Sequence, residues 1–275
     1  MSYTNQIQRG QKFEDTDFLK EIWRYRDLCM NLVGADLRAR FRRSRIGVVW
    51  AGIQPLAFAL LVSLVWSVVF EQSLAGFSVY VLSGMIVWEY VSNTVTASQD
   101  SFITAEGYLK QGRIPLLVFQ LRTPITGMVT FLIGYLVLIA LLFVLKQTPP
   151  VGLHTLLALA YLPLILAFVT PLACIFAILG TLMRDMRHAM LIVLNAVFFL
   201  SPIIVLRSYL ESESLLFLQY ANPLIPLLDM FRAPVLDGQA WSLLSFQIVI
   251  VWIVGLWLLA IIMSKKVGRK IVFAL

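Results

Sequence analysis

The feature that most constrains this chain is a cluster of cationic side chains followed directly by an uncharged stretch. Five arginines lie within eight residues, at positions 38, 40, 42, 43 and 45, and the next 25 residues, Ile46–Phe70, carry no charge. A helix needs about 20 apolar residues to cross the hydrocarbon core of a bilayer. Clustered Lys and Arg beside a span stay on the cytoplasmic side. The sequence therefore predicts the first membrane crossing at this point, and its orientation.

The composition indicates an integral membrane protein. Hydrophobic residues make up 60% of the chain and charged residues 13%, and the mean hydropathy is +0.85. The net charge of +7 could indicate nucleic-acid binding, but ten of the 22 Lys and Arg residues precede Ile46, and four follow the last apolar stretch. Charge at the flanks of spans is typical of membrane topology and of contact with anionic lipid headgroups. We expect membrane lipids, and no nucleic acid, as partners.

The region before the first span has a helical pattern. Between Asp17 and Arg42, apolar residues recur at alternating spacings of four and three, with polar residues opposite. An amphipathic helix with Trp and Tyr on its apolar side suits the membrane interface. The alternative is a helix packed on a soluble partner. The two interpretations are compatible if one face of the helix contacts lipid and the other contacts a protein. Residues 1–45 are therefore predicted to be a cytoplasmic tail and an interface helix, without a cleavable signal peptide.

Apolar windows predict an all-α membrane protein with six transmembrane helices within a domain 46–264. The segment 207–237 has an apolar core of 15 residues with two prolines, which favours a re-entrant outer cap between the fifth and sixth spans. This count leaves nineteen of the 22 Lys and Arg residues on one side, so both termini, including the tail 265–275, are expected to be cytoplasmic. The six windows are Ile46–Phe70, Gln72–Gln99, Thr123–Leu145, Val151–Met183, Ala189–Leu206 and Gly238–Ser264.

Few residues in these spans could carry chemistry. Glu89 is the one ionisable residue inside a predicted span apart from His154, which lies near an outer end. A proton relay is one interpretation of Glu89, and a polar wall residue or one near the interface is the other. The sequence contains no hydrolase motif, no metal-spaced Cys/His cluster and no GxxxxGK[ST] phosphate loop. We therefore expect no enzyme activity, no cofactor and no metal in this chain.

Aromatic residues are numerous, with 7 Trp, 9 Tyr and 18 Phe. Most would form the interfacial belts of a membrane protein. A subset on the first, second and fifth spans could instead face a pathway, because flat rings stack on sugars without requiring a charge. The candidates for lining such a channel are Trp50, Phe58, Trp66, Phe70, Trp88, Glu89, Tyr90, Phe198 and Phe199.

Several motifs together resemble the ABC-2 type polysaccharide export permeases, in order over about residues 34–240. The motifs are Asp36–Trp50 followed by Gln54-Pro55, Leu82–Trp88, Arg184-Asp185, Phe199–Ile203, and Asn222-Pro223-Leu224 with Phe231-Arg232. The chain departs from the family pattern at Ala35, Phe41, Glu89 and Gly112–Pro115. These departures bear on which polymer is carried rather than on the family.

The resemblance implies a channel-forming permease subunit that moves lipid-linked polysaccharide, of O-antigen or capsule type, across the inner membrane. It implies a homodimer with a pore at the two-fold interface and two copies of a separate ATPase, which bind ATP and Mg. An ABC-2 permease for a small drug or lipid is the main alternative, and a membrane-embedded lipid-sugar enzyme is another.

The same resemblance suggests where partners dock and where the outer mouth is capped. The charged candidates for ATPase docking are Glu21, Arg24, Glu106, Lys110, Arg113, Arg184, Asp185 and Arg187, and their alternative is a set of solvated loops beside lipid headgroups. The candidates for the outer cap are Asn222, Pro223, Asp229 and Arg232, the last two as an exposed ion pair.

Overall fold

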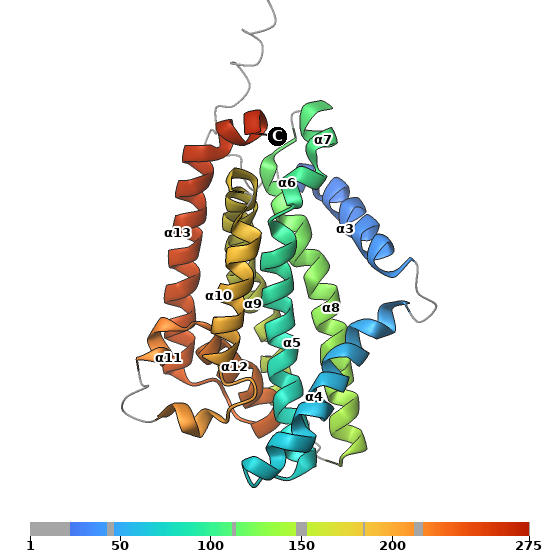
Figure 1. Cartoon of the computed structure of the whole chain (residues 1–275), viewed down its shortest axis with the longest axis vertical. Helices are drawn as coiled ribbons and strands as arrows, with labels where there is room; N and C mark the ends of the chain where they lie inside the picture. Colours follow the sequence, from blue (N-terminus) through green and yellow to red (C-terminus); the bar gives the residue numbers. More distant parts are fainter. Residues whose placement is uncertain are drawn as a thin grey trace, which may run out of the picture.

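A computed structural model describes residues 23–42, 47–111, 114–146, 153–183, 185–211 and 217–274, and the regular structure within them is helical (Figure 1). Five helical regions are long and apolar enough to cross a membrane: Gly47–Val69, Leu74–Ser98, Leu116–Val144, Leu157–Leu182 and Leu243–Lys266. They belong to η1 (Gly47–Val49) with α4 (Trp50–Val69), α5 (Leu74–Ser98), α8 (Leu116–Val144), α9 (Leu153–Leu182) and α13 (Leu243–Ala274). The predicted all-α membrane fold is confirmed at this level, and five of the six expected windows coincide with these helices.

The remaining window, Ala189–Leu206, forms a shorter helix than expected. Helix α10 (Met186–Phe199) has 14 residues, which at 1.5 Å per residue gives a length of about 21 Å, less than the thickness of the hydrocarbon core. The chain leaves the helix before Pro202, which has no backbone N–H to continue a helical ladder. A single unbroken helix over this window is therefore not what the chain forms.

The third span begins earlier than the charge pattern suggested. Helix α8 starts at Leu116, directly after Pro115, whereas the sequence placed residues up to Arg122 in a cytoplasmic loop. Arg122 lies inside the helix and forms an ion pair with Asp36 of α3 (Arg26–Phe41). A paired charge is tolerated in an otherwise apolar helix. A hydropathy window does not include the pairing residue, so it stops at Arg122 although the helix continues toward Leu116.

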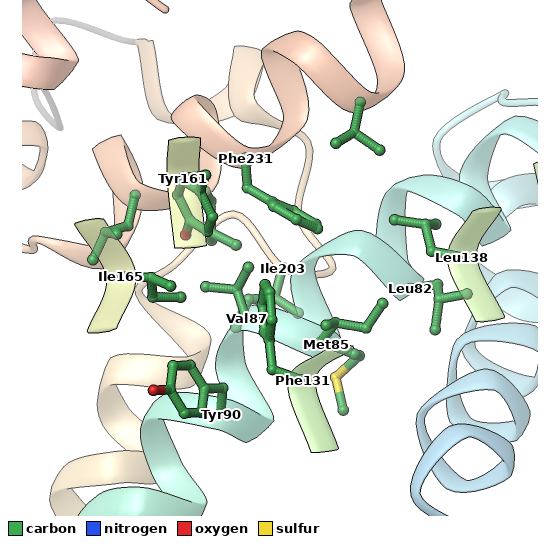
Figure 2. Close-up of a cluster of buried hydrophobic side chains, with 14 of the residues drawn as sticks. Leu82, Met85, Val87, Tyr90, Phe131, Leu138, Tyr161, Ile165, Ile203 and Phe231 are labelled. Carbon is green, nitrogen blue, oxygen red and sulfur yellow. The ribbon is translucent and has the colours of Figure 1, made fainter. Parts of the chain in front are cut away.

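Helix α5 is the centre of the bundle, with α4, α8 and α9 packed around it (Figure 1). The most apolar window of α5 is 67% buried, against 22% for α4 and 17% for α13. Figure 2 shows the core that results, in which Leu82, Met85, Val87 and Tyr90 of α5 meet side chains of other elements, including Phe131, Tyr161, Ile203 and Phe231. Helices on the outside leave apolar faces for lipid or for protein.

The two ends of the bundle differ. At one end lie α3, α6 (Ser101–Thr104), α7 (Glu106–Gln111) and the C-terminal end of α13 (Figure 1). At the other end lie η2 (Arg207–Glu211), α11 (Leu218–Ala221), α12 (Leu224–Arg232) and η4 (Ala233–Asp237). The segments expected to face the cytoplasm and those expected to cap the outer side are thus separated along the long axis.

Candidate functional site

Arg232 joins α12 to α5 and to the bend after α10. Its side chain is buried, with 5% exposure, at the end of α12. Nε donates to Ser83 Oγ at 3.0 Å, Nη1 to the Pro202 carbonyl at 2.6 Å and Nη2 to the Tyr80 carbonyl at 3.1 Å. The guanidinium carbon also lies 3.7 Å from the centre of the Tyr80 ring. The rigid fork of a guanidinium suits such a divergent set of acceptors, so α5, α12 and the bend after α10 are held together.

Asn222 adds a second connection to the same bend. Its Nδ2 donates to the Leu200 carbonyl at 3.2 Å and to Ser201 Oγ at 2.9 Å, and its Oδ1 accepts from the backbone N–H of Leu224 at 3.1 Å. Asn222 and Pro223 lie between α11 and α12. One amide side chain therefore fixes both the start of α12 and the bend.

The expected exposure of the Asp229–Arg232 pair is wrong, because the guanidinium of Arg232 is buried among carbonyl groups of α5 and the bend. Asp229 instead pairs with Arg207 of η2, with 3.1 Å between Nε and Oδ2. Both side chains of that pair are about one quarter exposed, at 23% and 26%. The segment 207–237 thus has a buried hydrogen-bonded arginine and a partly exposed ion pair.

The candidate channel residues do not share one environment. Tyr90 is 2% exposed and packs on Phe131 at 5.5 Å between ring centres, so its ring belongs to the core rather than to an exposed aromatic face. Trp88 packs on Phe198 and is partly buried, as is Phe70, which stacks on Trp66. The side chains exposed on outer faces are Trp50, Phe58, Trp66 and Phe199, and Glu89 is half-buried.

The candidate docking residues that the structure describes lie on several elements at the end of the bundle that carries α3, α6 and α7. Arg187, at the start of α10, forms an ion pair with Asp100, which precedes α6, so the loop after α5 is connected to α10. Arg24 and Asp185 are exposed. Glu106 and Lys110 belong to α7, and Glu21, Arg113 and Arg184 lie outside the described residues.

Helix α3 is attached to α8 by an ion pair and by apolar packing. Asp36 Oδ2 lies 2.6 Å from Arg122 Nε, and the Cys29 thiol donates to the Val118 carbonyl at 3.7 Å. Cys29 and Leu32 are buried against Phe119 and its neighbours. Burial raises the pKa of the Asp36 carboxyl, and the Arg122 guanidinium offsets part of that rise. The two side chains therefore meet at a partly desolvated contact between α3 and α8.

Removing the cation of this pair is expected to release α3 more than neutralising the carboxylate. Arg122→Met leaves a partly buried Asp36 carboxylate without its partner, and we expect a loss of about 2 kcal/mol in α3 docking, whereas Asp36→Asn keeps an acceptor and costs about 1 kcal/mol. The rate of maleimide labelling at Cys29, resolved by peptide mass spectrometry, measures the release. Cys174, buried in α9, is the internal reference, and equal Cys29 rates in both variants would contradict this ranking.

Two cavities lie beside α5. The outer one, about 270 Å³, is lined by Phe77 and Tyr80 with Gln72 and Asp237. The inner one, about 110 Å³, is lined by polar groups of four helices. Within the described ranges, no three His, Cys, Asp or Glu side chains come together as a metal site would need.

Sequence reasoning missed the residues that hold the site together. Tyr80, Ser83, Asp36 and Asp100 were not candidates, although each contacts one or more charged side chains. A charged residue inside an apolar segment indicates that it has a buried partner. Arg122 and Arg232 are such residues, but the sequence alone does not identify their partners.

Together, the five long apolar helices, with short helices at one end of the bundle and charged elements at the other, define a polytopic α-helical membrane protein. Residues 28–236 match the ABC-2 type transporter family, and the chain belongs to this family.

Relatives within the curated proteins are similar over most of their length. The chain is 26% identical over 216 residues to the "O-antigen export system permease protein RfbA" of Myxococcus xanthus, covering 78% of this chain and 82% of that protein. It is 24% identical over 234 residues to a protein of the same name from Klebsiella pneumoniae, covering 84% of this chain and 90% of that protein. A second Klebsiella pneumoniae protein of that name is 25% identical over 238 residues.

Proposed function

We propose that this chain is the channel-forming permease subunit of an ATP-driven exporter that moves lipid-linked polysaccharide of O-antigen type across the inner membrane. The observation that carries the proposal is the similarity, over 82–90% of their length, to three proteins named as O-antigen export permeases. Membership of the ABC-2 type transporter family and a sequence without a phosphate loop support a transport subunit whose energy comes from another chain.

The proposal includes a six-span topology with both termini in the cytoplasm. In it, α10 and the bend at Ser201-Pro202 together make the fifth crossing, and 207–237 is a re-entrant outer cap. Support comes from the opposite ends at which the cap elements and α3, α6 and α7 lie (Figure 1). The excess of Lys and Arg on the side of the termini supports the same orientation.

A homodimer with a pore between the two copies completes the proposed assembly. Exposed apolar side chains on α4 and α10, such as Trp50, Leu61 and Ile192, need lipid or a second copy to cover them. Two copies of the ATPase, with ATP and Mg, would dock on α3, α6, α7 and the start of α10. The Asp100–Arg187 pair would pass their movement from the α5–α6 junction to α10.

Complementation is the direct test. A host that lacks its own O-antigen permease should regain a ladder of surface polysaccharide when this chain and its cognate ATPase are supplied together, and not when either is supplied alone. The purified chain should hydrolyse no ATP without that subunit. ATP hydrolysis by the isolated chain would contradict the division of labour. A deletion strain that keeps its surface polysaccharide and becomes sensitive to drugs would identify a small-substrate permease instead.

A further inference from the structure

The inner cavity is a polar site enclosed by apolar helices. It lies between α4, α5 and α8 at the end of α3, and Gln54, Glu89, Asn93, Thr130 and Arg40 contribute polar groups to its wall. Glu89 is the only carboxylate within the five candidate spans that the structure describes. A carboxylate placed among apolar helices is costly unless polar partners satisfy it, so this concentration of hydrogen-bonding groups calls for a function.

The cavity lies beside the junction of α3 and α4, which the proposed topology places on the cytoplasmic side of the bundle. Ala51, Gln54 and Pro55, from the first two turns of α4, line it together with Arg40 of α3. Helix α5 continues nine residues beyond Glu89, to Ser98, which adds about 14 Å toward the cytoplasmic end. In Figure 1 the start of α4 lies next to the lower end of α3. The cavity therefore extends from the junction of α3 and α4 into the bundle, as far as a carboxylate well inside α5.

The side chains in the wall are those that recognise a sugar attached to an anion. A carboxylate accepts hydrogen bonds from hydroxyl groups, and the carboxamides of Gln54 and Asn93 both donate and accept. Arg40 offers the fork that binds phosphate oxygens. A volume of about 110 Å³ holds a few water molecules or the polar edge of one ring rather than a polymer. These groups come from three helices. A bare phosphate could be bound by the guanidinium alone and would not need the carboxylate and the two carboxamides.

We propose that the inner cavity binds the phosphate-linked first sugar of a lipid-anchored saccharide on the cytoplasmic side of the membrane. Glu89, Gln54 and Asn93 contact the sugar hydroxyls, and Arg40 contacts the phosphate. The inference rests on the proposed function for the lipid-linked nature of the cargo. Because Glu89 is one of the positions at which this chain departs from the pattern it resembles, the site would set this chain's preference for the first sugar.

Binding of short synthetic probes tests the site. The full-length chain, in phosphatidylcholine nanodiscs free of sugar detergents, is titrated with dodecyl phosphate, with dodecyl glycosides, and with glycosyl dodecyl phosphates that carry glucose, galactose or N-acetylglucosamine. At least one glycosyl phosphate should bind about tenfold more tightly than dodecyl phosphate and than its own glycoside. Glu89→Gln and Asn93→Ala should weaken that probe about tenfold and leave dodecyl phosphate unchanged. Arg40→Gln should weaken both phosphate probes.

Asp237→Asn, in the wall of the outer cavity, is the matched control and should change none of these affinities. The proposal is overturned if dodecyl phosphate binds as tightly as every glycosyl phosphate, which would make the cavity a phosphate headgroup site. Equal binding by the wild-type, Glu89→Gln and Asn93→Ala proteins overturns it as well. Complementation separates the two proposals: restored surface polysaccharide without this binding pattern rejects only the site, and the pattern without complementation rejects only the O-antigen function.

Discussion

Replacing Arg232 with Met is expected to destabilise the outer cap more than any other single change to a charged residue of the cap. The substitution removes three buried hydrogen bonds, which the guanidinium donates to the carbonyls of Pro202 and Tyr80 and to the hydroxyl of Ser83. The Tyr80 and Ser83 hydroxyls still donate to the Pro202 and Tyr80 carbonyls. Hydrogen bonds made by a charged donor contribute about 1.5–3 kcal/mol each, so the expected loss is about 3–6 kcal/mol. The methionine cannot restore any of these hydrogen bonds. Thermal unfolding of the purified protein in detergent measures the loss, and surface polysaccharide in the complementation host measures its consequence.

Two further variants make this result specific. Arg232→Lys keeps the charge but has one ammonium in place of a planar fork, so it should recover only part of the stability. Arg207→Met breaks the partly exposed pair with Asp229, and exposed pairs contribute about 1 kcal/mol or less. If Arg207→Met were as harmful as Arg232→Met, the cap would depend on surface charge and not on the buried network.

The positions of the long helices could be predicted because lipid leaves few options for the backbone. In hydrocarbon every N–H and C=O needs an internal partner, so uncharged windows of span length become helices. The window Ala189–Leu206 shows the limit of this reasoning. Hydropathy reports that the segment avoids water, but a helix that ends before Pro202 and a helix that continues have the same hydropathy. The bend depends on Arg232 and Asn222, which bond to Pro202 and Ser201 from another part of the chain.

The sequence predicts which segments carry the candidate residues, but not which side chains surround them in the fold. The motif around Arg232 placed it in the cap, but its partners Ser83 and Tyr80 lie 149 and 152 residues away in sequence, and one sequence contains no signal of that contact. Aromatic residues show the same limit. Tyr90 and Trp88 are two positions apart on α5, yet the first is in the core and the second is partly buried beside Phe198. Since α5 is surrounded by other helices, both of its faces are apolar. Its composition therefore does not reveal which face is buried in the core.

Gly180→Ala is expected to separate α9 from the C-terminal end of α5. A Cβ at Gly180 would lie 2.5 Å from the Gln99 carbonyl oxygen and 2.7 Å from its Cα. These are backbone atoms next to Asp100, so the helices must move apart, and the contact cannot be relieved by a rotamer change. Overpacking of this kind costs about 3 kcal/mol. Because Asp100 pairs with Arg187, the same shift should disturb the proposed connection between the α5–α6 junction and α10.

Gly255→Ala on α13 is the matched control, because a Cβ there meets nothing within 4 Å among the described residues. Removing a glycine from an open helix position should raise stability by about 0.5–1 kcal/mol. The pair is compared by thermal unfolding and by ATP hydrolysis of the permease–ATPase complex, which Gly180→Ala should lower and Gly255→Ala should leave unchanged. If both variants lost stability equally, the close contact at Gly180 would not be the cause, because a Cβ at Gly255 meets no described neighbour. A loss confined to Gly180→Ala would identify the close α5–α9 contact as the requirement, and with it the position of the α5–α6 junction on which the proposed docking surface depends.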